Sequence, residues 1–312
     1  MNMVYMGTPE FAVTILDRLL QAGHDVSMIF TQPDRPKGRG KKLQAPPVAE
    51  YAKQHGLPLM QPDSVRTPEV ENLLVELKPD VVVVAAYGRI IPDALLSQPK
   101  YGYLNVHASL LPKYRGAAPI QWALRNGDIK TGVSIMQLTS GLDEGPVFKK
   151  AALTIQPNWN KKDLFDALAD LGATCLLDTL KEIDRLTPIP QDHEQATYAP
   201  VFGKQDGCID FSQSAQELVN LSRSLEPDDS IYTFINNKRL AFKNVSISDM
   251  IDTKHMAPGT VLSVTKKAID IATEDGVLRV TEVQPAGKKP MPVQSFLNGH
   301  PLQVGDRFII ES

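Results

Sequence analysis

Short apolar runs alternate with amphipathic stretches along the first half of the chain. Apolar residues recur at helical spacing from Phe11 to Gln21, and segments 48–55 and 68–77 also have helical patterns. The run from Val81 to Ala86 is apolar on both faces, which is typical of a central strand in a parallel sheet covered by helices. The alternation therefore predicts an α/β domain with an open, mostly parallel sheet. Its expected strands are residues 3–6, 26–30, 81–86, 103–106 and 133–138.

The pattern changes in the second half of the chain. A long helix with apolar residues on one face from Leu164 to Leu180 is followed by residues 187–204, which contain three prolines. We predict that 187–204 is a linker between a domain at 1–186 and a second domain at 205–312. Short alternating runs punctuated by glycines follow a helix at 215–225, and they are typical of a small antiparallel barrel. These runs are residues 232–235, 240–242, 260–264, 268–272, 277–283 and 307–310.

Composition limits the function classes. The formal net charge of −3 argues against a protein that coats nucleic acid, although it permits a local basic patch. No apolar run approaches the roughly 18 residues that a membrane helix needs. The chain enters an apolar strand at once, without a basic flank or a cleavage site, so we expect no signal peptide and a cytoplasmic protein. Cys175 and Cys208 fit no metal-ligand pattern, so we expect reduced structural thiols and no metal.

One predicted strand ends in polar residues of catalytic type. Within the segment YLNVHASLLP at 103–112, Asn105 and His107 are two residues apart, so their side chains share a face of the strand. They lie at its carboxyl end, where open parallel sheets bind their ligands. The alternative is that Asn105 caps a turn and His107 is a structural histidine.

Two loops extend this candidate site. In the loop 108–119, Leu110, Leu111 and Pro112 form a stiff apolar wall that suits a flat heteroaromatic ring, or they are surface residues whose leucines are tucked away. The turn 140–145 flanks Asp143 with glycines, so it either presents a carboxylate or is an ordinary acidic turn.

Together these residues suit acyl transfer without a covalent intermediate. An amide donor and an imidazole can hold an oxyanion on the transferred carbon. A nearby carboxylate can orient the imidazole, or it can take up the proton of an attacking amine directly or through water.

A cluster of basic residues lies in segment 35–42. The interleaved Pro36, Gly38 and Gly40 disfavour a helix, so we expect a mobile loop rather than a packed element. Such a loop either becomes ordered against RNA phosphates or is merely a solvated basic surface. The basic residues are Arg35, Lys37, Arg39, Lys41 and Lys42.

These segments resemble the formyltetrahydrofolate-dependent transferases. The Asn-x-His and SLLP parts are shared across that superfamily. The basic segment and the QPAGKK block are more specific to its tRNA enzymes, which this chain resembles over nearly its whole length. The blocks that carry the resemblance are MGTPEFA at 6–12, QPDRPKGRGKKL at 32–43, AYGRIIP at 86–92, NVHASLLP at 105–112, RGAAPI at 115–120, GLDEG at 141–145 and QPAGKKP at 284–290.

The resemblance implies a fold, a reaction and a set of site residues. It implies a Rossmann-like domain followed by an OB-like, tRNA-binding barrel. The formyl donor would be 10-formyltetrahydrofolate, and the acceptor would be the α-amine of methionine on initiator methionyl-tRNA, giving N-formylmethionyl-tRNA for translation initiation. The catalytic residues would be Asn105, His107 and Asp143, the folate site would include Ser109, Leu110, Leu111 and Pro112, and the basic residues of 35–42 would contact tRNA. We expect a monomer that binds no membrane.

One stretch departs from the family, and three other functions compete. Glu226-Pro227-Asp228-Asp229 stands where the family has an Asn-Pro-Trp-Pro-like sequence, so the local packing beside the barrel cannot be inferred from the resemblance. A nicotinamide dehydrogenase is disfavoured, because the first turn lacks Gly-x-Gly-x-x-Gly. A folate enzyme that formylates a nucleotide-sugar or purine-precursor amine is disfavoured by the basic segment and the barrel. A non-catalytic RNA-binding protein is disfavoured by the intact trio of Asn105, His107 and Asp143.

Overall fold

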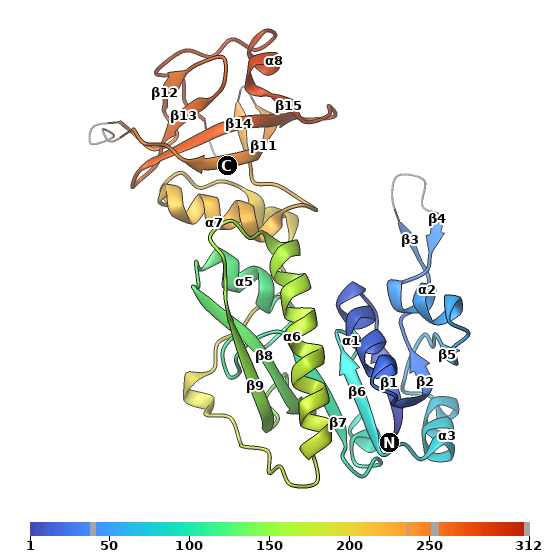
Figure 1. Ribbon diagram of the computed structural model, residues 1–312. Coiled ribbons are helices and arrows are strands. Elements are labelled where there is room, and N and C mark those ends of the chain that lie inside the picture. Colours follow the sequence, from blue (N-terminus) through green and yellow to red (C-terminus); the bar gives the residue numbers. More distant parts are fainter. Residues whose placement is uncertain (38–41, 236, 251–255, 309–312) are drawn as a thin grey trace. The chain divides into compact units, whose positions relative to one another are not determined.

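The computed structural model describes residues 1–37, 42–235, 237–250 and 256–308 (Figure 1). They form two compact units, of which the first contains residues 1–119, 130–155 and 164–200 and the second contains 120–129, 156–163 and the chain from 201 onward. Residues 187–200 of the predicted linker thus belong to the first unit. That the chain divides into separate domains at 187–204 stays a prediction. Every helix of the described residues is too short or too polar to cross a membrane.

A seven-stranded sheet is the frame of the first unit (Figure 1). The ladders from β5 to β7 are parallel, whereas β7–β8 and β8–β9 are antiparallel. The predicted mostly parallel sheet is confirmed. The edge strand β9 was not predicted, because its sequence VFKKAALT lacks a clear alternation. In spatial order the strands are β5 (Leu59–Met60), β2 (Asp25–Phe30), β1 (Asn2–Gly7), β6 (Val81–Ala85), β7 (Tyr103–His107), β8 (Lys130–Gln137) and β9 (Val147–Thr154).

Amphipathic helices connect these strands. The apolar face of α1 is buried, and Thr67 caps the start of α3, because its side chain accepts a hydrogen bond from the Val70 amide at 3.4 Å. The long helices match the predicted segments, whereas the short α4 and α5 have too few turns to show a period. The helices are α1 (Glu10–Gln21), α2 (Pro47–Gln54), α3 (Pro68–Leu77), α4 (Asp93–Leu96), α5 (Pro119–Arg125) and α6 (Lys161–Glu182).

Close contact between β8 and β9 depends on Gly132. A Cβ atom at Gly132 would lie 2.1 Å from the Ala151 carbonyl oxygen and 2.7 Å from the Leu110 side chain. We therefore expect Gly132→Ala to lower the free energy of unfolding by about 1–3 kcal/mol, as overpacking does. Gly299→Ala is the control, because a Cβ there meets nothing within 4 Å. Calorimetric unfolding of both variants checks this, and equal stabilities would contradict it.

The second unit contains an antiparallel half-barrel. Its strands follow the order β10-β11-β14-β13-β12, and β15 pairs with β14. The predicted small antiparallel domain is confirmed, although of the expected run 307–310 only Arg307 and Phe308 are described, and Arg307 makes an isolated bridge with Thr260. The elements are η2 (Lys204–Gly207), α7 (Ala215–Leu225), β10 (Tyr232–Ile235), β11 (Lys238–Ile247), β12 (Val261–Val264), β13 (Ile269–Ala272), β14 (Val277–Pro285), β15 (Met291–Pro292) and α8 (Val293–Leu297).

The unusual acidic stretch after α7 has partners within this unit. The Glu226 carboxylate accepts a hydrogen bond from the Ser222 hydroxyl at 2.7 Å, and burial raises the pKa of Glu226. Asp228 pairs with Lys161 at 2.6 Å. Glu226 and Asp228 therefore both have local partners.

The basic segment is more regular than predicted. Strand β3 (Arg35–Lys37) pairs antiparallel with β4 (Lys42–Gln44), with Arg35 opposite Gln44. The flanks are therefore exposed paired strands rather than an irregular loop, since backbone pairing does not require an apolar pattern. That the segment is mobile stays a prediction. Arg39 and Lys41 lie outside the described residues, and only the backbone of Lys37 is described.

Candidate active site

Strand β7 brings Asn105 and His107 to the carboxyl end of the parallel part of the sheet. Asn105 lies beside Val84 of β6 and opposite Met136 of β8. Both side chains leave β7 on the same face, as the strand period predicts. Asn105 is half-buried, and no described residue hydrogen-bonds its side chain. Its amide is therefore available to a ligand.

His107 is held by one ring nitrogen and faces a carboxylate with the other. Its Nε2 lies 2.9 Å from the carbonyl oxygen of Tyr114, and its Nδ1 lies 3.6 Å from Oδ2 of Asp143. Because a carbonyl only accepts hydrogen bonds, Nε2 carries a proton in this arrangement. Nδ1 is thus the nitrogen that can exchange a proton or contact a substrate.

Asp143 is presented by the sharp turn that its flanking glycines predict. Its φ of +49° is left-handed, which is uncommon for a residue other than glycine. A Cβ at Gly145 would lie 1.9 Å from the Gln137 carbonyl oxygen, so only glycine fits there. The Asp143 carboxylate accepts the Gly116 amide hydrogen at 2.8 Å, and its side chain is 14% exposed. A carboxylate so placed can reach both His107 and solvent.

A distant segment supports the loop after β7. The Arg115 amide donates to the Thr197 carbonyl at 2.8 Å, and the Ala199 amide donates to the Arg115 carbonyl at 2.7 Å. Thr197 also accepts the Tyr114 amide hydrogen on its hydroxyl at 2.9 Å. Gly116 has a φ of +117°, and a Cβ there would lie 2.8 Å from the Ala199 carbonyl oxygen. The predicted linker therefore supports the residues that hold His107 and Asp143, a role that the sequence pattern did not reveal.

The residues expected to bind folate differ in exposure. Ser109 and Leu111 are buried, and the Ser109 hydroxyl donates to the Lys113 carbonyl at 2.5 Å. Leu111 packs against Met136 and Val147. Leu110 and Pro112 are half-buried, so they retain surface for a ligand. That all of Ser109 to Pro112 line a folate site stays a prediction.

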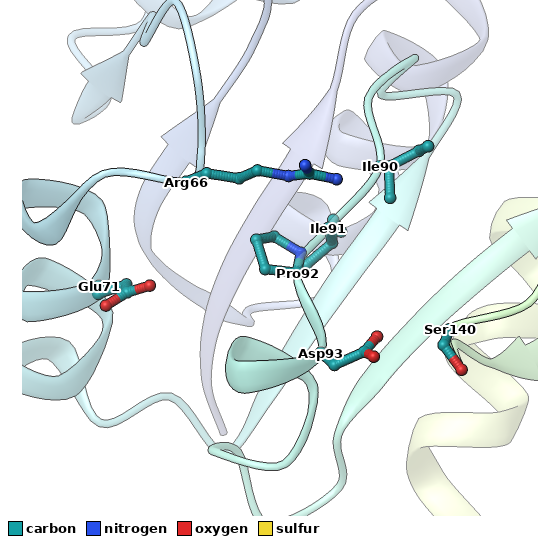
Figure 2. A pocket seen from close by; sticks show the side chains of 7 residues that line it. All are labelled: Arg66, Glu71, Ile90, Ile91, Pro92, Asp93 and Ser140. Carbon is teal, nitrogen blue, oxygen red and sulfur yellow. The ribbon is translucent and has the colours of Figure 1, made fainter.

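A cavity of about 460 Å³ borders the turn that carries Asp143. Ser140, at the start of that turn, is part of its lining, whereas Asn105, His107 and Asp143 are not. Figure 2 shows the Arg66 side chain extending toward the segment that contains Ile90 and Pro92. The lining consists of Arg66, Glu71, Ile90, Ile91, Pro92, Asp93 and Ser140.

Two known families match consecutive parts of the chain. Residues 1–180 match the family described as Formyl transferase, and residues 202–301 match the Formyl transferase, C-terminal domain. Methionyl-tRNA formyltransferase from Geobacter metallireducens is 43% identical over 309 residues, which cover 98% of each chain. The protein of the same name from Acetivibrio thermocellus is 42% identical over 308 residues, covering 98% of this chain and 99% of the relative.

Solved structures share the fold. A methionyl-tRNA formyltransferase from Clostridium thermocellum has a TM-score of 0.58 at 16% identity, covering 80% of this chain and 94% of the other. HypX from Aquifex aeolicus, in complex with tetrahydrofolic acid, has a TM-score of 0.63 at 17% identity; this chain spans 50% of HypX. The sequence relatives and the two family matches decide the assignment. The chain belongs to the formyl transferase family and, within it, to the methionyl-tRNA formyltransferases.

Proposed function

We propose that this chain transfers the formyl group of 10-formyltetrahydrofolate to the α-amine of methionine on initiator methionyl-tRNA. The observation that carries the proposal is the contact of His107 with Asp143, 3.6 Å apart, at the end of the strand that also presents Asn105. As part of the proposal, the enzyme acts as a monomer in the cytoplasm, where translation begins.

The reaction needs charge stabilisation and one proton transfer. The amine nitrogen attacks the formyl carbon, and negative charge develops on the formyl oxygen. The bond from that carbon to N10 of the carrier then breaks, and the proton that the amine loses replaces the formyl group on N10. The donors for the oxyanion are the Asn105 amide and Nδ1–H of His107; because Nε2–H is bound to the Tyr114 carbonyl, His107 donates from Nδ1 only as an imidazolium. Asp143 lies where it can orient His107 or take up the amine proton, directly or through water.

The cavity beside the Asp143 turn suits the carrier. Its volume of about 460 Å³ lies within the range of roughly 300–1,000 Å³ that small-molecule sites occupy. Ile90, Ile91 and Pro92 offer an apolar wall for a flat ring, and Arg66 offers a cation for a carboxylate of the folate. Leu110 and Pro112 would extend the apolar surface.

A formyl-transfer assay tests the proposal directly. The purified protein is given 10-formyltetrahydrofolate with charged initiator tRNA, or with a nucleotide-sugar amine as the competing acceptor. We expect formylation of the methionyl-tRNA and none of the sugar. Formylation of the sugar amine alone would assign the chain a different acceptor.

The basic segment 35–42 should contribute to tRNA binding rather than to carrier binding. Each phosphate that a basic residue neutralises releases counterions, so binding should weaken steeply with salt. We expect Lys42→Ala, Lys41→Ala or Arg39→Ala to lower kcat/KM for charged tRNA and to flatten its salt dependence, while carrier binding is unchanged. Lys53→Ala is the control, since Lys53 is an exposed lysine on α2. An unchanged salt slope after all five basic residues are neutralised would contradict a tRNA contact.

A further inference from the structure

A buried glutamine in the predicted linker braces the turn that carries Asp143. Gln191 is 8% exposed. Its Nε2 donates to the carbonyl oxygen of Asp143 at 2.8 Å and to that of Gly145 at 2.7 Å. A primary amide has two N–H donors, so both are used on this one turn.

Arg115 fixes the orientation of this amide. Arg115 is 2% exposed, and its guanidinium donates to Oε1 of Gln191 from Nε at 3.1 Å and from Nη2 at 2.9 Å. If the amide of Gln191 were flipped, its NH₂ group would face the guanidinium and its oxygen would face two carbonyls. Charge-assisted hydrogen bonds from a rigid guanidinium therefore allow only one orientation.

The residues on either side of Arg115 hold the two catalytic groups. The carbonyl of Tyr114 binds Nε2 of His107, and the amide of Gly116 binds the carboxylate of Asp143. The same short segment thus positions His107, Asp143 and, through the Arg115 side chain, the glutamine that holds the Asp143 backbone. A shift of the Asp143 turn would change the 3.6 Å separation between the imidazole and the carboxylate.

We propose that Gln191 is a positioning residue for formyl transfer, which acts by holding the left-handed Asp143 turn so that its carboxylate faces His107. This inference rests on the role proposed above for Asp143. Gln191 acts through the turn that carries Asp143 rather than on the substrate, because described residues of the protein engage both its amide nitrogen and its amide oxygen. A small displacement of a catalytic group lowers the rate of chemistry more than it lowers affinity.

Two variants at Gln191 test the proposal. Gln191→Ala removes both donors, and Gln191→Glu replaces them with a carboxylate of the same size that can still accept from Arg115. We expect each to lower kcat by about 10- to 100-fold, with KM for the carrier and for tRNA changed by less than about threefold. Gln191→Glu serves if Gln191→Ala fails to fold. Gln195→Ala is the matched control. Among the described residues, the Gln195 side-chain amide donates to Asp192 alone, at 2.7 Å, beside the short helix η1 (His193–Gln195), so kcat should be unchanged.

A double-mutant cycle with Asp143→Asn separates positioning from a general structural role. If Gln191 acts through Asp143, adding Gln191→Ala or Gln191→Glu to Asp143→Asn should lower kcat by less than about threefold, because residues that act as a unit are not additive. If the Gln191 substitution lowers kcat equally in the wild-type and Asp143→Asn enzymes, or only as far as it lowers thermal stability, the proposed role of Gln191 is wrong while that of Asp143 stands. A normal kcat for Asp143→Asn would overturn the proposed role of Asp143 and this inference with it.

Discussion

Asn105→Ala is expected to lower kcat by about a hundredfold or more, because loss of one oxyanion donor typically costs roughly 3 kcal/mol of transition-state stabilisation. The fold should survive. Asn105 is half-buried, and no described residue hydrogen-bonds its side chain, so alanine leaves no protein partner unsatisfied. An interaction made only in the transition state affects kcat and kcat/KM alike, so KM for both substrates should stay near the wild-type value.

Single-turnover rates with saturating carrier and charged tRNA measure this effect. Asn105→Asp is a shape-matched companion: it keeps the side-chain size but presents a carboxylate to the developing oxyanion, so it should be at least as slow as alanine. Circular dichroism and thermal unfolding show whether each variant is folded. A folded Asn105→Ala enzyme with near-normal turnover would show that Asn105 does not hold the oxyanion.

The local parts of this site could be predicted from sequence. The two-residue period of a strand places Asn105 and His107 on one face, and Gly141 and Gly145 predict the turn around Asp143. These inferences hold because they depend on the backbone geometry of a few consecutive residues.

The hydrogen bonds that hold the Asp143 turn and the segment after β7 could not be predicted, because their partners are backbone groups far away in sequence. Gln191 binds carbonyls 48 and 46 residues before it, and Thr197 accepts an amide hydrogen from 83 residues before it. Every residue has a carbonyl, so such a partner leaves no mark in the sequence. Proline and polar residues at 187–204 therefore predict a linker, although part of it binds the turn of Asp143 and the segment 114–116.

For a related reason, the sequence does not predict which residues of the SLLP loop are buried and which are exposed. An apolar residue in a loop can face a ligand or the core, and the pattern does not distinguish the two. Leu111 packs against Met136 and Val147 and is only 1% exposed, whereas Leu110 and Pro112 are half-buried. The sequence identifies the chemical character of such a loop, and only the fold identifies which of its residues can meet a substrate.

Asp143→Asn is expected to lower kcat by about two to three orders of magnitude, within the range that positioned acid–base groups contribute. The substitution keeps the size of the side chain, and its amide oxygen can still accept the Gly116 amide hydrogen that Asp143 accepts at 2.8 Å. What is lost is the negative charge beside Nδ1 of His107, 3.6 Å away. A neutral amide can neither take up the amine proton nor stabilise an imidazolium, so the loss falls on chemistry rather than on carrier affinity.

Comparing kcat with the dissociation constant of the carrier separates these effects. Carrier affinity should change by less than about threefold while kcat falls, since the lost interaction strengthens only as charge develops. Glu144→Gln is the matched control: Glu144 is the adjacent acid in the same turn, but its side chain is exposed. That control should retain wild-type turnover. Parallel losses of affinity and turnover in Asp143→Asn would assign Asp143 to binding or to the structure of the turn, and the proton would then need another acceptor.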